Sequence, residues 1–95
     1  MEFEWDEDKR EANLVKHGID FARAITIWQR PVIDPAASRT QGTEIRYLAL
    51  GMIGEDDLVI AIVYTMRDNV RRVISARRGR RYERASYKGQ FDRGN

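Results

Sequence analysis

The segment Leu58–Met66 is almost continuously apolar, and it constrains the fold more than any other part of the chain. A short apolar run of this kind is typical of a β-strand that is buried on both faces. Strand-like segments flank it at Glu44–Ile53 and Val70–Ala76, and short turns at 54–57 and 67–69 separate the three. Because such short connections reverse the chain, the three segments predict an antiparallel meander.

Residues before the meander predict two helices. Asp6 is a suitable N-cap for a helix that ends near His17, where Gly18 can adopt the left-handed conformation that closes many helices. Asp20 can cap a second helix, which Pro31 ends. The residues expected to face the core are Ala12, Val15 and Ile19, followed by Phe21, Ala24, Ile25 and Trp28.

The remaining segments complete the predicted order β, α, α, β, β, β, α, which begins with a short strand at Phe3–Trp5. Ala36–Thr43 predicts a polar loop, Gly79–Lys88 a helix and Gly89–Asn95 a flexible tail. We expect one compact α+β domain over residues 1–95, with two N-terminal helices packed on an antiparallel sheet of three to four strands and a C-terminal helix. The residues of that last helix expected to face inwards are Tyr82 and Ala85.

Charge is divided unevenly along the chain. Residues 1–66 contain 7 Lys and Arg against 12 Asp and Glu, whereas residues 67–95 contain 10 against 3, which gives formal charges of −5 and +7. This asymmetry indicates nucleic acid or an acidic partner, because cations that contact a polyphosphate release its condensed counterions. A solvated basic face on an ordinary domain explains the charge equally well.

The basic part begins at Arg77 and Arg78, where a strand-like stretch gives way to the segment 80–88. A strand that delivers two guanidiniums to a surface favours phosphate binding, because the planar guanidinium matches phosphate oxygens. Apolar and polar residues alternate less cleanly along this strand, and the alternation predicts two faces. Arg71, Val73, Ser75 and Arg77 lie on one, and Arg72, Ile74 and Ala76 on the other.

Composition excludes several classes of site. The chain has no cysteine, so we expect no disulfide, thiolate metal site or thiol nucleophile. With a single histidine as well, we expect neither a metal nor another cofactor. No apolar run approaches the roughly 20 residues of a membrane span, and the N-terminus is acidic where a signal peptide is basic. These features predict a cytoplasmic protein with no membrane partner.

RNA cleavage is a reaction that the available side chains can perform without a cofactor. The 2′-OH of the substrate attacks the adjacent phosphorus, so the protein must supply a base, an acid and cations for the phosphorane. Histidine is the side chain best suited to proton transfer near neutral pH, so His17 is a candidate acid or base, although a helix-end histidine that only stabilises the helix dipole explains its position better.

Three other candidates have two interpretations each. Tyr64 is either a phenol at the rim of the sheet or a core tyrosine. Arg46 lies either in a substrate groove or on a solvated face of its strand. Trp5 either stacks on a base or packs within the fold.

Four segments spread over residues 3–87 carry a recognisable pattern: FEWDEDKREANLVKHGIDF, RYLALGMI, VIAIVYTMR and VRRVISARRGRRYERASY. Together they resemble the BrnT family of bacterial type II toxins. The resemblance implies a RelE-like fold, a ribonuclease that inhibits translation, and a BrnA-type antitoxin with a ribbon-helix-helix DNA-binding domain. It also implies a complex of two toxins and two antitoxins that binds operator DNA only through the antitoxin.

The leading hypothesis is a metal-independent endoribonuclease of the bacterial cytoplasm whose substrate is RNA. The alternative is a non-catalytic basic module that binds nucleic acid. Under the first hypothesis we assign catalysis to Arg77, His17, Tyr64 and Arg46, and RNA or phosphate binding to Arg67, Arg78, Lys16 and Trp5.

Overall fold

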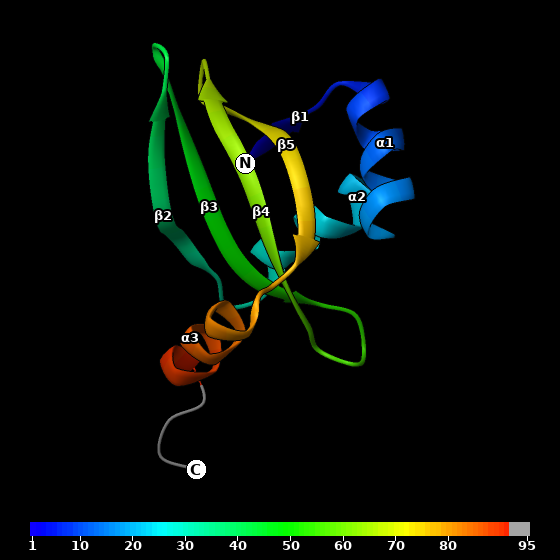
Figure 1. Cartoon of the computed structure of the whole chain (residues 1–95), viewed down its shortest axis with the longest axis vertical. Coiled ribbons are helices and arrows are strands. Elements are labelled where there is room, and N and C mark those ends of the chain that lie inside the picture. The colour runs from blue at the N-terminus through cyan, green and yellow to red at the C-terminus, as the bar shows by residue number, and fades with distance from the viewer. Residues whose placement is uncertain (92–95) are drawn as a thin grey trace.

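A five-stranded sheet organises the chain, and the computed structural model describes residues 1–91 (Figure 1). The strands are β1 (Glu2–Glu4), β2 (Ile33–Gln41), β3 (Glu44–Ile53), β4 (Leu58–Arg67) and β5 (Val70–Arg78). The helices are α1 (Glu7–His17), α2 (Phe21–Ala24), the 3₁₀ helix η1 (Ile25–Gln29) and α3 (Arg81–Phe91). Within residues 1–91, no helix combines the length and the apolar character that crossing a membrane requires.

The predicted meander forms the centre of this sheet. The strand order is β1-β5-β4-β3-β2, and the pairs from β2 to β5 are antiparallel. β1 pairs with the start of β5 in parallel, through Glu2–Glu4 and Val70–Arg72. The sheet is therefore larger than the predicted three to four strands, and it is mixed. The short strand predicted at Phe3–Trp5 forms one residue earlier as β1, and β1 and β2 are the two edge strands.

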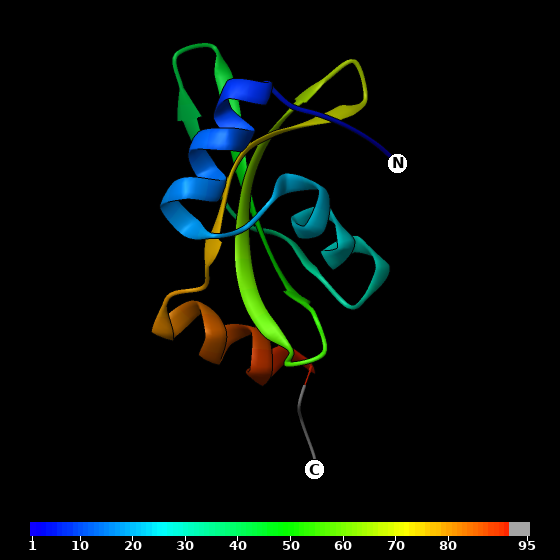
Figure 2. The same cartoon turned by 90° about the vertical axis from the view of Figure 1, so that its right-hand side faces the viewer.

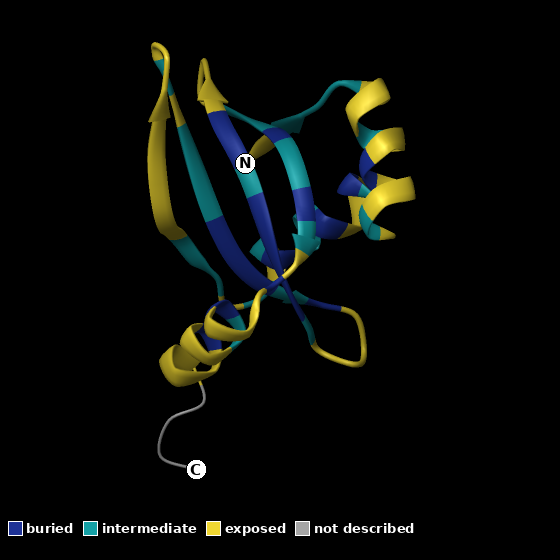
Figure 3. Ribbon diagram, in the orientation of Figure 1, coloured by how far each residue is buried: buried dark blue, intermediate teal, exposed yellow. Residues whose placement is uncertain are grey.

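The predicted polar loop at Ala36–Thr43 is wrong, because most of it belongs to β2. A two-residue turn at Gly42 and Thr43 joins β2 to β3, and Gly42 takes the positive φ of 65° that suits the first central position of a tight hairpin. Residues 36–41 are exposed along this edge strand (Figure 3). The strand consequently lacks the apolar alternation that identifies a half-buried strand.

The two faces of the sheet are covered by different helices (Figure 2). On the helical face, Phe21 and Ala24 of α2 and Ile27 of η1 pack on a core that includes Ala49 and Ile62. On the open face, α3 places Tyr87 on Leu50, Val59 and Ala61, and the Tyr87 hydroxyl donates to the carbonyl of Pro31 at 2.7 Å. α3 lies over one end of the open face only, and no other helix of residues 1–91 lies above the remainder of that face (Figures 1 and 2).

The orientation and length of α3 differ from the prediction. Tyr82 and Ala85 are exposed, whereas Glu83 and Tyr87 are buried. The helix continues to Phe91, so the predicted tail is wrong for residues 89–91, and residues 92–95 lie outside the described part of the chain. Tyr82 faces outwards because Glu83 and Tyr87, four residues apart, occupy the inner side of the helix.

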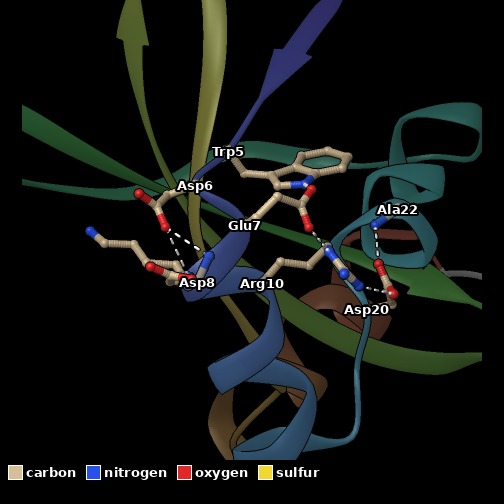
Figure 4. Close-up of polar contacts among 8 residues, drawn as sticks. Trp5, Asp6, Glu7, Asp8, Arg10, Asp20 and Ala22 are labelled. Atoms are coloured by element: carbon tan, nitrogen blue, oxygen red, sulfur yellow. Dashed lines mark hydrogen bonds and ion pairs between the residues drawn. The ribbon is translucent and has the colours of Figure 1, made fainter.

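Ion pairs and caps fix the turn between α1 and α2 (Figure 4). Asp6 caps α1 by accepting from the amides of Asp8 and Lys9, and Asp20 caps α2 by accepting from the amide of Ala22, as predicted. Arg10 connects the N-terminal ends of α1 and α2. Its guanidinium forms ion pairs with Glu7 at 2.7 Å and with Asp20 at 2.9 Å. The chain between them reverses at Gly18, whose φ of 71° confirms the predicted left-handed closure of α1.

Asn13 attaches α1 to the free edge of β5. Its amide nitrogen donates to the carbonyls of Ala76 and Ile19, each at 2.9 Å, and its oxygen accepts from the amide of Ala76 at 3.1 Å. This side chain thus satisfies both edge groups of Ala76 as a neighbouring strand would. The inner side of α1 therefore carries Asn13, which is 6% exposed, and the predicted core residue Val15 is 89% exposed.

A bulge at Ile74 changes which side chains of β5 share a face. Val73 pairs with Tyr64, but Ser75 pairs with Val63, so Ile74 is the additional residue. Arg77 and Ser75 consequently point to the open face, and Arg71 and Val73 point to the helical face. The predicted placement of all four residues on one face is wrong.

We predict that Asn13→Ala lowers the free energy of unfolding by at least about 2 kcal/mol, because it leaves three buried backbone groups without partners. Urea denaturation measures this loss. Val15→Ala, two residues along the same helix at an exposed position, is the control and is expected to change stability by less than about 0.5 kcal/mol. Equal stability of the two variants would contradict the conclusion that Asn13 satisfies the backbone groups at the edge of β5.

Candidate functional site

The uncovered part of the open face holds a cavity of about 400 Å³ that four arginines line. We call it the arginine groove. Arg39 comes from β2, Arg46 from β3, Arg77 from β5, and Arg80 from the residue before α3. The other lining residues are mainly small or apolar: Ala37, Ser38, Tyr47, Leu48, Val63, Ile74 and Ser75.

Arg39 and Arg46 lie directly opposite each other in the β2–β3 ladder. Like charges in this relationship destabilise a sheet, so their pairing has a cost that the fold alone does not explain. The Nε atom of Arg46 is buried without a hydrogen-bond partner among the described residues, and its nearest carboxylate, Glu44, lies 3.9 Å away. An anion in the groove would relieve the repulsion and accept from these donors.

Arg77 is held by a bidentate ion pair with Glu83. The two guanidinium nitrogens donate to the two carboxylate oxygens at 2.7 and 3.1 Å, and Glu83 also accepts from the amide of Arg80 at 2.7 Å. Glu83 is only 3% exposed. The hydrogen bond between the partners raises the pKa of Arg77 and lowers the pKa of Glu83.

The ion pair orients Arg77 without using all of its donors. Within residues 1–91, Arg77 makes three hydrogen bonds, two to Glu83 and one to the carbonyl of Arg78. A guanidinium has five N–H groups, so two stay available to a ligand. Arg77 is therefore a fixed donor at the end of the groove.

His17 and Lys16 lie beside the groove rather than within it. With Lys9 they line a shallow depression of about 210 Å³ at the end of α1. The depression and the arginine groove share Ile74 and Ser75 of β5. An extended ligand that follows this strand surface from the groove therefore reaches His17.

Tyr64 lies on the helical face, opposite the groove. Its hydroxyl donates to Asp34, which also accepts from Trp28 at 3.0 Å and from Arg71 at 3.1 Å. The Arg71 guanidinium lies 5.3 Å from the ring centres of both Trp28 and Tyr64. Burial, with the hydrogen bond to Asp34, raises the pKa of Tyr64, so the phenol is protonated at neutral pH.

The other predicted binding residues are dispersed. Trp5 packs edge to face on Phe21 at 6.0 Å and donates to Glu7, which places it with the core of the helical face (Figure 4). Arg67 ends β4 and reaches Glu44 at 3.4 Å. Arg78 is exposed, and its register with Ile60 directs it to the helical face.

Three residues of the site were not among the predicted site residues: Arg39, Arg80 and Glu83. Arg39 and Arg46 are equally distant from the turn at Gly42 and Thr43, so a hairpin prediction at that turn would have paired them. Glu83 is the third residue of α3 and accepts from the amide of Arg80, the residue before the helix, as in half of a capping box. The sequence carries only the Glu half of this signal, because Arg80 lacks the side-chain oxygen with which Ser or Thr completes a capping box.

The geometry of the groove suits a phosphodiester chain. Four cations surround a floor of small and apolar groups, so the groove can hold phosphates while bases or sugars contact the floor. A model of one family matches residues 5–83, and its description is "Ribonuclease toxin, BrnT, of type II toxin-antitoxin system". The chain belongs to the BrnT family. No curated protein sequence matches it.

Membership of the BrnT family indicates which activity and which kind of partner to expect. BrnT-family chains are ribonuclease toxins of type II toxin-antitoxin systems, so an RNA-cleaving activity and an antitoxin partner are properties of the family. The predicted resemblance is therefore confirmed. The match extends from Trp5 to Glu83 and so includes all four arginines of the groove.

Glu83→Gln provides a test of the ion pair through pH. Because the pKa of Glu83 is lowered by folding, its contribution to stability is present above about pH 4.3 and is lost as the pH falls through its folded value. We predict that Glu83→Gln is less stable than the parent by about 1–3 kcal/mol at pH 7 and that the difference narrows below pH 4. Thermal unfolding from pH 7 to pH 3 measures both. A difference that stays constant with pH would contradict the assignment.

Proposed function

We propose that the chain is a metal-independent endoribonuclease that binds and cleaves RNA in the arginine groove. The observation that carries the proposal is the convergence of Arg39, Arg46, Arg77 and Arg80 on one cavity. The directly opposed Arg39 and Arg46 support it further, because an anion bound between them would compensate their repulsion. The family supports the same activity.

The proposed reaction is internal transesterification. The 2′-oxygen forms a bond to phosphorus as the bond from phosphorus to the 5′-oxygen breaks, which leaves a 2′,3′-cyclic phosphate. One proton leaves the 2′-OH and one is added to the 5′-oxygen. Arg77 and Arg46 stabilise the charge that develops on the non-bridging oxygens, and the fixed position of Arg77 avoids reorganisation during the reaction.

His17 is the group that we favour for proton transfer. It lies next to the groove across Ile74 and Ser75, and its helix-end position leaves it half-buried. Tyr64, the other predicted proton donor or acceptor, donates to Asp34 on the opposite face. We therefore assign Tyr64 to the positioning of β2, through Asp34, and not to the reaction.

The positions of the remaining predicted binding residues indicate which of them can contact RNA on either side of the groove. Lys16 borders the depression beside the groove and can contact a phosphate on that side. Arg67, Arg78 and Trp5 lie away from the groove, so they contact only RNA that extends past the edge of the sheet. We expect their contribution to affinity to be smaller than that of the groove arginines.

Cleavage of RNA by purified protein in the presence of EDTA tests the reaction. We predict fragments that end in 2′,3′-cyclic phosphate, and a rate that falls by on the order of 10²-fold or more in Arg46→Ala. Arg46 is a cleaner target than Arg77, because Arg77→Ala would also leave buried Glu83 without its partner.

Arg23→Ala is the control, since Arg23 is an exposed arginine of α2 with no place in the groove. It should cleave RNA at the parental rate. A strict requirement for a divalent ion would overturn the metal-independent mechanism. Salt-sensitive RNA binding with no cleavage by the parental protein would favour the non-catalytic binding module instead.

The toxin context adds three further elements to the proposal. We propose a RelE-like fold, inhibition of translation through RNA cleavage in the bacterial cytoplasm, and neutralisation by a BrnA-type antitoxin with a ribbon-helix-helix domain. An acidic segment of that antitoxin would cover the arginine groove and exclude RNA directly. Because ribbon-helix-helix domains dimerise, the complex would contain two copies of each protein and would contact operator DNA through the antitoxin.

Hydrogen exchange on the free and antitoxin-bound protein tests this occlusion. We predict protection between Arg67 and Arg84, including the strand that carries Arg77. Because β2 also lines the groove, protection is expected there too, and protection confined to α1, α2 and η1 would contradict the occlusion. Light scattering is expected to give a mass of two toxins and two antitoxins, and a one-to-one mass would overturn the proposed stoichiometry.

A further inference from the structure

Tyr82 stands apart from the other tyrosines of the chain. Tyr47 stacks on Tyr64 at 5.4 Å, and Tyr87 packs on Phe91 at 4.9 Å. Tyr82 makes no aromatic contact within residues 1–91 and is 66% exposed. A large aromatic side chain that is left exposed in the first turn of a helix is available to a ligand.

Tyr82 borders a second, smaller cavity on the open face. The cavity has a volume of about 130 Å³ and lies between α3 and the β2–β3 hairpin. Its walls are mainly apolar, and the Ser86 hydroxyl adds a group that can donate and accept hydrogen bonds. The residues that form it include Ala36, Ala37, Leu48, Leu50, Tyr82 and Ser86.

This cavity is continuous with the arginine groove. Both are lined by Ala37 and Leu48, so a ligand can occupy the two together. The cavity also adjoins Arg77, because Glu83 lines it and accepts from the Arg77 guanidinium at 2.7 and 3.1 Å. A group bound against Tyr82 is therefore next to the phosphate that Arg77 would hold.

We propose that this cavity is a nucleobase subsite, in which Tyr82 stacks on the base adjacent to the phosphate in the arginine groove. The inference rests on the proposed function and adds a determinant of RNA recognition to it. A base suits the site better than a second phosphate does, because the walls are mainly apolar and no Lys or Arg is among the described residues that line them. Ser86 can then distinguish bases through the polar atoms at their edges.

The test uses short 2′-O-methyl RNA, which binds but cannot supply the attacking hydroxyl, with each position made abasic in turn. We expect one abasic position to weaken binding to the parental protein by about 10- to 100-fold, the range for loss of one stacked base. Tyr82→Ala should weaken binding of the intact RNA by a similar factor and lose nothing further at that abasic position. Tyr82→Phe keeps the ring and should bind within about threefold of the parental protein.

Several outcomes separate this inference from the proposed function. Val15→Ala, at an exposed apolar position of α1, is the control and should bind every RNA as the parental protein does. If the parental protein cleaves RNA but Tyr82→Ala binds intact RNA normally, the subsite is wrong and the ribonuclease stands. The subsite is also wrong if the loss from Tyr82→Ala adds to the loss at every abasic position. It is wrong as well if Tyr82→Ala weakens binding of the antitoxin but not binding of RNA. Failure of the parental protein to cleave RNA at all would instead overturn the proposed function.

Discussion

The ion pair between Arg77 and Glu83 connects the end of β5 to the start of α3, and the site depends on this connection. Glu83 accepts from Arg77 and from the amide of Arg80, so one buried carboxylate fixes a strand end, a helix start and the turn between them. α3 consequently lies over only one end of the open face. The uncovered part becomes the arginine groove, and the junction with the helix becomes the cavity beside Tyr82. A pair of this kind gives geometric specificity even where its net contribution to stability is small.

The bulge at Ile74 divides the arginines of β5 between two functions. Arg71, on the helical face, is enclosed by Trp28, Tyr64 and Asp34 and helps to attach β2 to the rest of the sheet. Arg77, on the open face, keeps donors for a ligand. Arg71 therefore stabilises the fold on one face, and Arg77 is placed for the proposed chemistry on the other. The two arginines of one strand have different surroundings because of the bulge between them.

Elements that are determined by residues close together in the sequence could be predicted from the sequence. The caps at Asp6 and Asp20, the closure at Gly18 and the meander built around Leu58–Met66 were all predictable. The edge strand β2 was not, because its exposed small residues have no apolar period. For the site, Arg46 and Arg77 were predicted residues that meet in one cavity, but Arg39 depended on recognising β2. The placement of Tyr64 opposite them depended on long-range pairing with Asp34, which no local pattern encodes.

The central claim is that RNA binds the open face of the sheet, and an NMR titration of the protein with 2′-O-methyl RNA tests it most directly. The account predicts chemical-shift changes at the groove arginines and Tyr82 that weaken as salt is increased. Changes confined to the helical face, around Trp28, Tyr64 and Arg71, would contradict it.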